Sequence, residues 1–240
     1  MQDHHIDDTY YFYQIEIYSS ETRSWRLAGD PFLAHVNTLF KYGVFCNNAV
    51  HWISAWGHSL YFNIGEEKVK EMPMPPLPEG WEERRYVYFG SNRNHLHLVE
   101  IYSPPTTQFD VYEMKSDYSE WLVKYRIDLS EIVAAFPEVV RIHYDPSSLN
   151  YHTFNMLGPK YNRPVHNILC IIREEQDEDS YMVLHIPGNI VSYSFKDKTF
   201  RKIRDFVPDY ANEDHNRIHG SAFGFRWFEV FQFVESFCGV

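Results

Sequence analysis

One structural unit recurs four times along this chain: a strand-like run, a charged turn, and a large apolar residue after the turn. The first three units begin at Glu16, Tyr61 and Phe109, about 45 to 48 residues apart, and the fourth begins at Ile190, near twice that step further on. Spacing of this size is typical of a β-propeller, in which each blade is a sheet of four short antiparallel strands. The repeat therefore predicts an all-β chain built from stacked blades.

Pairs of apolar runs precede the later hairpins and fit the inner strands of such blades. They are residues 43–46 with 49–53, 86–89 with 95–99, and 167–172 with 181–185. Asn47 and Asn48 stand between two of these runs and indicate a tight turn. Aromatic residues make up 18% of the sequence, which favours strands over helices. One short helix is expected over residues 130–136, where Asp128 and Glu131 resemble a capping box and Pro137 ends the element.

No domain boundary is evident, so residues 1–240 are predicted to form a single domain. We expect an incomplete propeller with about four blades plus a terminal strand in the aromatic carboxyl end, around Phe231 and Phe233. The charged hairpin tips, including the acidic run 174–179, are expected to be solvated.

The charge of the chain argues against nucleic acid as a partner. There are 22 Lys and Arg against 33 Asp and Glu, a net charge of −11, and no basic stripe that could follow a phosphate backbone. No apolar run approaches the ~18 residues that span a bilayer. The three cysteines lie far apart in apolar runs, as buried thiols do, and the polar start differs from a signal peptide. We expect no membrane partner and a location in the cytoplasm or nucleus.

Several motifs of this chain are shared with a plant protein family. They are the run Y-S-S-E-T-R-S-W-R at 18–26, V-H-W-I at 50–53, M-P-M-P-P at 72–76, L-H-L at 96–98, I-P-G-N-I-V at 186–191 and F-Q-F-V-E-S at 231–236. On these motifs the chain resembles the F-box-associated domain of plant F-box proteins, which is kelch-like. The resemblance covers most of the chain.

The resemblance implies a domain that holds a target protein. In such proteins an amino-terminal F-box docks on a Skp-type adaptor of a cullin ubiquitin ligase, and the associated β domain binds the substrate. The 240 residues contain no F-box pattern, and the first blades of the domain are expected to be missing as well. The adaptor and the cullin are therefore expected as partners only if an F-box is supplied upstream. A decoy without an F-box, and a propeller that binds a carbohydrate or small ligand, stay open as alternatives.

Motifs for catalysis are missing from the sequence. The G-x-S-x-G elbow, the phosphate-binding loop and the dinucleotide fingerprint do not occur. His219 and Ser221 could share a strand face, but no carboxylate or oxyanion donor is indicated beside them. His95 and His97 alternate along a strand, yet a zinc site needs three or four ligands, and the nearest carboxylate, Glu100, falls on the opposite face. We expect no enzyme, no catalytic residue, no cofactor and no metal.

Aromatic residues in two loops are the candidates for partner binding. Trp56 and His58 lie between two strand signals, and Trp81 follows a Pro-Glu-Gly turn. Exposed tryptophans in loops are frequent anchors of protein interfaces, although an aromatic that closes one blade against the next is the commoner use. The other tryptophans of the repeats are expected in the cores of the blades: Trp25, Trp52 and Trp121.

Overall fold

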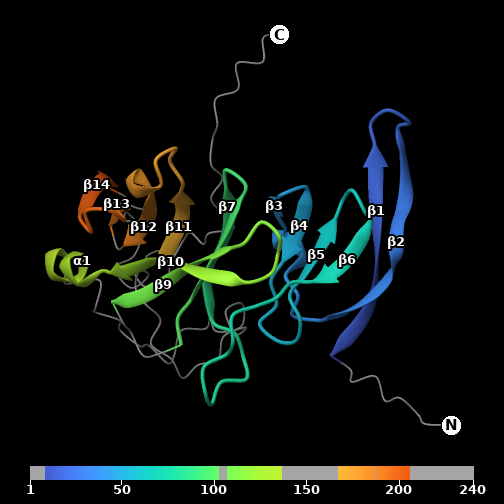
Figure 1. Ribbon diagram of the computed structural model, residues 1–240, viewed down its shortest axis with the longest axis horizontal. Helices are drawn as coiled ribbons and strands as arrows, with labels where there is room; N and C mark the ends of the chain where they lie inside the picture. Colours follow the sequence, from blue (N-terminus) through green and yellow to red (C-terminus); the bar gives the residue numbers. More distant parts are fainter. Residues whose placement is uncertain (1–8, 103–106, 137–166, 187, 206–240) are drawn as a thin grey trace, which may run out of the picture.

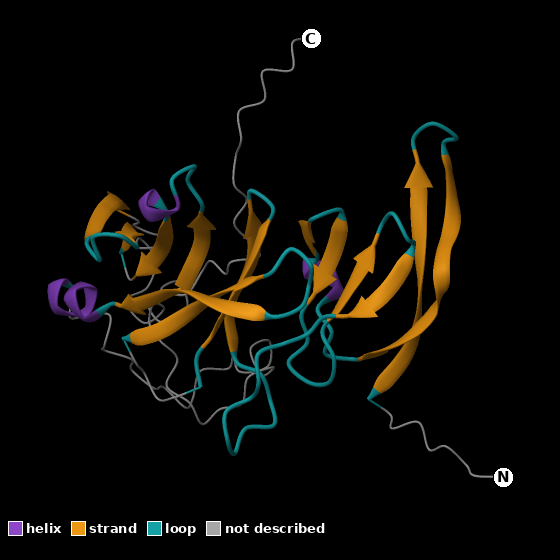
Figure 2. Cartoon of the chain, in the orientation of Figure 1, coloured by secondary structure: helices purple, strands orange, loops and turns teal. Residues whose placement is uncertain are grey.

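Figure 1 shows the computed structural model of the chain, which describes residues 9–102, 107–136, 167–186 and 188–205. This described part is built almost entirely from antiparallel strands, with one short α-helix (Figure 2). None of the helices in these ranges is long and apolar enough to cross a membrane. The prediction of an all-β chain is confirmed.

The strands form one hairpin and three four-stranded sheets, and each sheet follows the chain without a crossover. The hairpin consists of β1 (Tyr10–Ser19) and β2 (Ser24–His35). The next sheet contains β3 (Val44–Cys46), β4 (Ala49–Trp52), β5 (Leu60–Asn63) and β6 (Lys68–Glu71). The third contains β7 (Tyr86–Asn92), β8 (His95–Glu100), β9 (Gln108–Met114) and β10 (Trp121–Asp128), followed by helix α1 (Ser130–Ala135). The fourth contains β11 (Asn167–Ile172), β12 (Tyr181–Ile186), β13 (Asn189–Ser194) and β14 (Phe200–Asp205).

Tight turns fix the register of two inner hairpins. Asn47 and Asn48 join β3 to β4, and Arg93 and Asn94 join β7 to β8; all four have positive φ angles, from 48° to 61°. Two consecutive residues with positive φ are typical of the type I′ turn, whose twist matches that of the strands it connects. The predicted turn at Asn47 and Asn48 is confirmed.

The sheets stand side by side around their innermost strands. β7 contacts both β3 and β11, and β2 contacts β6 on the outer side. Sheet β7–β10 is consequently covered on both faces, and its residues alternate between two cores. Tyr88 and Val99 pack against sheet β11–β14, whereas Phe89 and Leu98 pack against sheet β3–β6. The alternation follows from the period of two along a strand. The arrangement is that of an incomplete, propeller-like fold.

The predicted hairpins are confirmed as β1–β2, β5–β6, β9–β10 and β13–β14, and α1 lies where a helix was expected. β11 contacts β7 directly, so the third and fourth sheets are neighbours, and residues 137–166 between them in the sequence lie outside the described residues. The predicted terminal strand, together with His219, Ser221 and Cys238, lies outside the described residues. The kelch-like type of the propeller and the missing upstream blades stay predictions.

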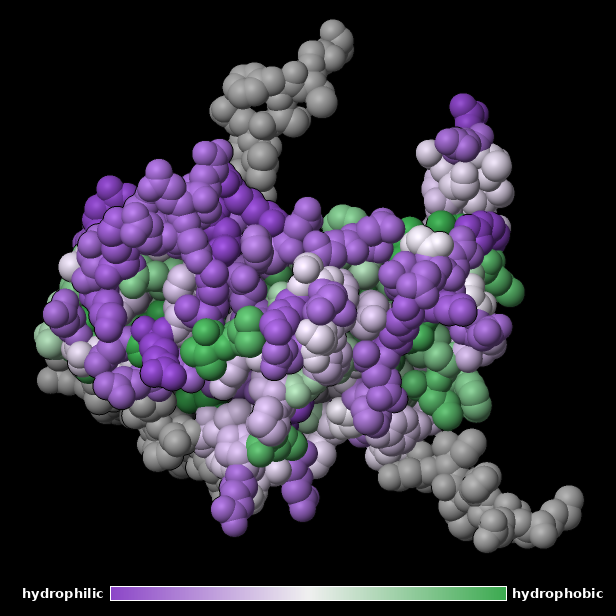
Figure 3. Space-filling view, viewed as in Figure 1, coloured by the Kyte–Doolittle hydropathy of each residue, from purple (hydrophilic) through white to green (hydrophobic). Residues whose placement is uncertain are grey.

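One tryptophan that was predicted for a core is exposed instead. Trp25 lies on the outer face of the β1–β2 hairpin beside Tyr18 and is 65% exposed. Phe12, Leu27 and Leu33 share this face, and hydrophobic atoms are visible along this edge of the molecule in Figure 3. The prediction for Trp25 is wrong because no described sheet covers the outer face of the hairpin.

Trp52 and Trp121, which were predicted as core residues, are only half-buried: Trp121 packs against a core, whereas Trp52 lies outside both clusters of buried residues. Trp52 meets the ring of Phe40 edge-on with 5.3 Å between the centroids. Trp121 packs against the core between sheets β3–β6 and β7–β10, and its indole N–H donates to the carbonyl oxygen of Pro73 at 2.7 Å. This bond fixes the Pro-rich segment after β6 to the neighbouring sheet.

Candidate partner-binding site

Trp56, His58 and Trp81 lie at one end of the stacked sheets. Residues 53–59 join β4 to β5, and residues 72–85 join β6 to β7. Neighbouring antiparallel strands run in opposite directions, so both connections lie opposite the β3–β4 and β5–β6 turns, at the lower edge of the molecule in Figure 1. We call residues 53–59 and 72–85 the loop end. The structure thus brings the three candidate residues to the same end of the protein.

The two segments of the loop end are joined through the backbone. The amide of Arg84 donates to the carbonyl oxygen of Ala55 at 2.9 Å. Within the first segment the amide of Ser54 donates to the hydroxyl of Ser59 at 3.1 Å, and the Ser54 hydroxyl donates to the carbonyl oxygen of Trp56. Both serines are fully buried, so these bonds are shielded from water. Trp56 therefore stands on a rigid support.

A buried ion pair anchors the second segment. Arg84 Nη1 lies 3.0 Å and 3.3 Å from the two carboxylate oxygens of Glu100 in β8, and Nη2 donates to the carbonyl oxygen of Pro75 at 2.6 Å. The Glu100 side chain is only 3% exposed. Burial raises the pKa of Glu100, although the charge and the hydrogen bond of Arg84 act to lower it. Because desolvating two charges is costly, the pair holds the segment only while both partners are present.

Trp81 closes a tight turn and packs on its neighbours. Its amide donates to the carbonyl oxygen of Pro78 at 3.1 Å, and Gly80 between them has a φ of +81°, which glycine adopts without strain. The indole meets the Tyr102 ring edge-on at 5.5 Å, and the Arg85 guanidinium lies 4.6 Å from the centre of the indole. Trp81 is half-buried rather than free, so its exposed part has a fixed position before any partner arrives.

Trp56 and His58 face solvent at the same end. Trp56 is 37% exposed, and His58 Nδ1 lies 3.3 Å from the carboxylate of Glu71, with both of these side chains largely exposed. Gly57 has a φ of +69°, and a Cβ at this position would lie 2.6 Å from the hydroxyl of Tyr10, so the loop requires glycine there. The loop end thus offers two indoles and an imidazole, which bury large areas at protein interfaces.

Exposed carboxylates lie in or next to the same two segments as these aromatic rings. Glu71, Glu79 and Glu82 are exposed in or next to the loop end, whereas its two arginines are engaged, Arg84 with Glu100 and Arg85 on the Trp81 ring. Complementary charge governs orientation and association rate at protein interfaces. By its chemistry the loop end can accept apolar groups flanked by cations.

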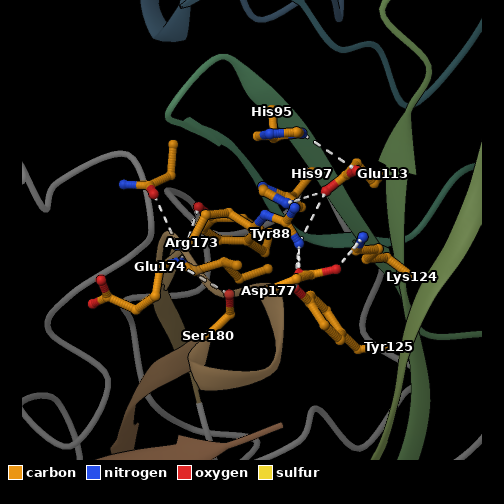
Figure 4. Close-up of polar contacts among 12 residues, drawn as sticks. Tyr88, His95, His97, Glu113, Lys124, Tyr125, Arg173, Glu174, Asp177 and Ser180 are labelled. Carbon is orange, nitrogen blue, oxygen red and sulfur yellow. Dashed lines mark hydrogen bonds and ion pairs between the residues drawn. The ribbon is translucent and has the colours of Figure 1, made fainter. Parts of the chain in front are cut away.

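A second polar cluster, which sequence reasoning missed, joins sheet β7–β10 to sheet β11–β14 (Figure 4). His95 and His97 share one face of β8, as predicted, and both contact Glu113 of β9, at 3.3 Å and 3.2 Å. Arg173, just after β11, lies 3.6 Å from Glu113 and is bonded to Asp177. Glu113 is the cross-strand partner of His97, so the strand register is the signal that could have found it.

Asp177 is not simply solvated, contrary to the prediction for the acidic run. Its carboxylate accepts hydrogen bonds from Arg173 and from the Tyr125 hydroxyl, and it pairs with Lys124. Burial acts to raise the pKa of Asp177, but the bonds from Lys124 and Tyr125 outweigh it and hold the pKa below its usual range. Lys124 and Tyr125 belong to β10, so the β11–β12 connection is fixed to the outer strand of the preceding sheet.

This cluster fits a packing role better than catalysis or metal binding. His97 has no exposed surface, and its pKa is lowered chiefly by burial. In the ranges that the structure describes, no group of three or more His, Cys, Asp and Glu side chains is arranged to hold a metal ion. Burial raises the pKa of Cys46 and of Cys170 to about 11, so neither thiol is an activated nucleophile.

Comparison with known proteins connects the chain to a plant F-box protein. The F-box protein At5g07610 of Arabidopsis thaliana is 34% identical over 239 residues, a match that covers 95% of this chain and 51% of that protein. The resemblance to plant F-box proteins is confirmed. The chain spans about half the length of the curated relative it matches. No family model matches the sequence.

Proposed function

We propose that this chain is a protein-interaction domain that holds a target protein for an F-box subunit of a cullin-type ubiquitin ligase. The similarity to a plant F-box protein over 95% of the chain supports this role. The observation that carries the proposal is the loop end, where Trp56 and Trp81 stand on supports fixed by buried hydrogen bonds and by the Arg84–Glu100 pair. Aromatic anchors that are rigid before binding lose little conformational entropy on association.

The chemistry of the loop end indicates the kind of target segment that would fit. The two indoles favour apolar or aromatic side chains, and the exposed Glu71, Glu79 and Glu82 favour Lys or Arg beside them. A non-catalytic role agrees with the way the titratable groups are used. His97 and Glu113 bond each other between packed sheets, and Glu100 neutralises Arg84.

Trp56→Ala and Trp81→Ala are each expected to weaken target binding by about 2 kcal/mol, or roughly 30-fold in the dissociation constant, because truncated tryptophan anchors have effects of this size. The matched control is Trp25→Ala, which removes an exposed indole near the β1–β2 turn, away from the loop end. The three variants and the unmodified chain would be compared by quantitative mass spectrometry of proteins captured from a plant extract, followed by calorimetric titration of the captured target.

Target proteins that bind the loop end should be lost with Trp56→Ala and Trp81→Ala but retained with Trp25→Ala. Equal capture by all four proteins would place the binding surface elsewhere. Urea unfolding of each variant shows whether a loss of capture reflects binding or a loss of folded protein.

The 240-residue chain by itself is expected not to bind a Skp-type adaptor, because its sequence contains no F-box pattern. A pull-down with purified adaptor measures this directly, and stable, stoichiometric capture would contradict the prediction. Fusing an F-box to the amino terminus is expected to confer adaptor binding without changing capture of the target. Ubiquitination of the target by the natural full-length protein then separates a ligase subunit from a decoy.

A further inference from the structure

The Pro-rich segment that runs from β6 toward β7 (Figure 1) is buried with a period of three. Along residues 72–77 the side chains repeat twice in the order buried, exposed and half-buried. A polyproline II helix has three residues per turn, so side chains three positions apart lie along one edge of it. Met72 and Pro75 form the edge that packs on the protein, and Pro73 and Pro76 form the exposed edge. We call residues 72–77 the proline ridge.

The sequence of the proline ridge fixes this conformation before any partner binds. Proline holds its own φ at about −65°, and a residue that precedes proline is confined to extended or polyproline II geometry. Each position from 72 to 78 is a proline or stands directly before one. The ridge therefore loses little conformational entropy when it is bound, an advantage that proline-rich recognition segments share.

Two side-chain hydrogen bonds hold the proline ridge against the rest of the protein. The indole N–H of Trp121, in β10, donates to the carbonyl oxygen of Pro73 at 2.7 Å, and Arg84 Nη2 donates to that of Pro75 at 2.6 Å. Met74 packs against the core between sheets β3–β6 and β7–β10. The folded sheets thus display the ridge in one orientation, with its exposed edge outward.

The outward side of the proline ridge offers hydrogen-bond acceptors but few donors. Proline has no N–H, and the carbonyl oxygens of Met74 and Pro76 accept no hydrogen bond from the described residues. A matching surface must therefore combine flat apolar contact with N–H or O–H donors, which Trp and Tyr side chains provide together. Exposed Glu71 and Glu79 flank the ridge, so cations at the rim of such a surface complement it.

We propose that the proline ridge is the ligand of a partner domain whose groove is lined with aromatic side chains and rimmed by Lys or Arg. Pro73 and Pro76 lie about 9 Å apart along a polyproline II axis, and prolines at this PxxP spacing dock in aromatic-lined grooves. The ridge is part of the loop end, but the proposal holds whether or not the chain serves a ligase. Its failure would leave the proposed function standing, because that function is tested by Trp56→Ala and Trp81→Ala.

Purified domains that bind polyproline II segments test the proposal. An SH3, a WW and an EVH1 domain would each be titrated into the fluorescently labelled 240-residue chain, with anisotropy as the readout. At least one of these classes is expected to bind saturably, one domain per chain, and a polyproline peptide should displace it from the chain. Absence of saturable binding by every class would overturn the proposal, as would binding that the peptide does not displace.

Variants of the two exposed prolines locate the contact. Pro73→Ala combined with Pro76→Ala should weaken the binding at least about 10-fold, because it removes both anchors. The matched control, Pro31→Ala, removes an exposed proline of β2 and should leave the binding unchanged. Urea unfolding of each variant measures how much of it is folded under the conditions of the titration. Equal affinity of the double variant and the unmodified chain would place the contact elsewhere and contradict the proposal.

Light scattering of the chain alone addresses the alternative occupant, a second copy of the chain. The measured mass is expected to be the same with and without the two proline substitutions. An oligomer that dissociates when Pro73 and Pro76 are replaced by Ala would assign the ridge to self-association and would equally overturn the proposal.

Discussion

Arg84→Met is expected to lower the free energy of unfolding by about 3–5 kcal/mol, because it leaves the carboxylate of Glu100 buried without its partner. The Glu100 side chain is 3% exposed, so water cannot replace the guanidinium. The variant also loses the hydrogen bond from Arg84 to the carbonyl oxygen of Pro75, which fixes the loop end. Urea unfolding at pH 7 gives the value.

Two further variants show whether burial is the cause. Arg84→Met combined with Glu100→Leu removes both charges and should recover most of the lost stability. Arg26→Met breaks the pair with Glu67, in which the two side chains are 54% and 35% exposed, and should cost far less because water screens an exposed pair. A loss at Arg84 no larger than the loss at Arg26 would show that solvent screens the Arg84–Glu100 pair as well.

Acidification should rescue Arg84→Met in part. Burial raises the pKa of Glu100 in the folded chain, and removing Arg84 takes away the charge that opposes this effect. A carboxyl whose pKa is higher in the folded than in the unfolded state takes up a proton on folding, so it favours the folded state as the pH falls. The difference in stability between the variant and the unmodified chain should therefore shrink from pH 7 to pH 5. A constant difference would mean that Glu100 finds another partner.

The strands could be predicted from the sequence because each sheet is a local meander. Alternating apolar residues and turn residues such as Asn47 and Asn48 act over a few positions, so each hairpin could be recognised without knowledge of the rest of the chain. Trp25 shows the limit of prediction from local sequence patterns. Its burial depends on whether another sheet covers the outer face of the hairpin, and no local pattern carries that information.

The candidate site was likewise predicted only in part. Trp56 and Trp81 lie in loops as predicted, because turn signals mark those positions, while their role in binding stays a prediction. Their supports were missed, since the Arg84–Glu100 pair depends on how a connection folds back over a sheet. Contacts of this kind follow from packing between elements rather than from periodicity. Glu113 is an intermediate case, because pairing β8 with β9 in register would have placed it beside His97.

The free energy of unfolding is expected to fall by several kcal/mol between pH 7 and pH 5, because three histidines are buried in the folded chain. His51 and His97 have no exposed surface, and His185 is 2% exposed. Burial is the largest influence on all three and lowers their pKa. Protonating His97 would place a second N–H on a buried ring, where the described residues offer it no acceptor. Nε2 already donates to Glu113, while Nδ1 has no hydrogen-bond partner among the described residues.

The direction of the change follows from where the proton binds. An unfolded histidine has a pKa of about 6.5 and takes up a proton as the pH falls below that value, whereas a buried histidine with a lowered pKa stays neutral. The unfolded state then binds more protons, so stability falls by up to about 1.4 kcal/mol per pH unit for each histidine. Glu100, whose pKa burial raises, acts in the opposite sense, between the pKa of an unfolded carboxyl, about 4.3, and its own higher pKa in the folded chain.

Urea unfolding of the unmodified chain and of His97→Gln at pH 7, 6 and 5 tests this dependence. Glutamine can still donate to Glu113 but cannot take up a proton, so the variant should show a smaller loss of stability on acidification, by up to about 1.4 kcal/mol per pH unit. Equal slopes would mean that His97 takes up its proton over the same pH range in the folded and the unfolded chain, and a larger loss in the variant would mean that His97 is already protonated in the folded chain, with Glu113 outweighing burial. Staying at or above pH 5 keeps Glu113 and Asp177 largely ionised in the folded chain, because their contacts hold both pKa values below the usual range. The slope in this window therefore reports chiefly on the buried imidazoles.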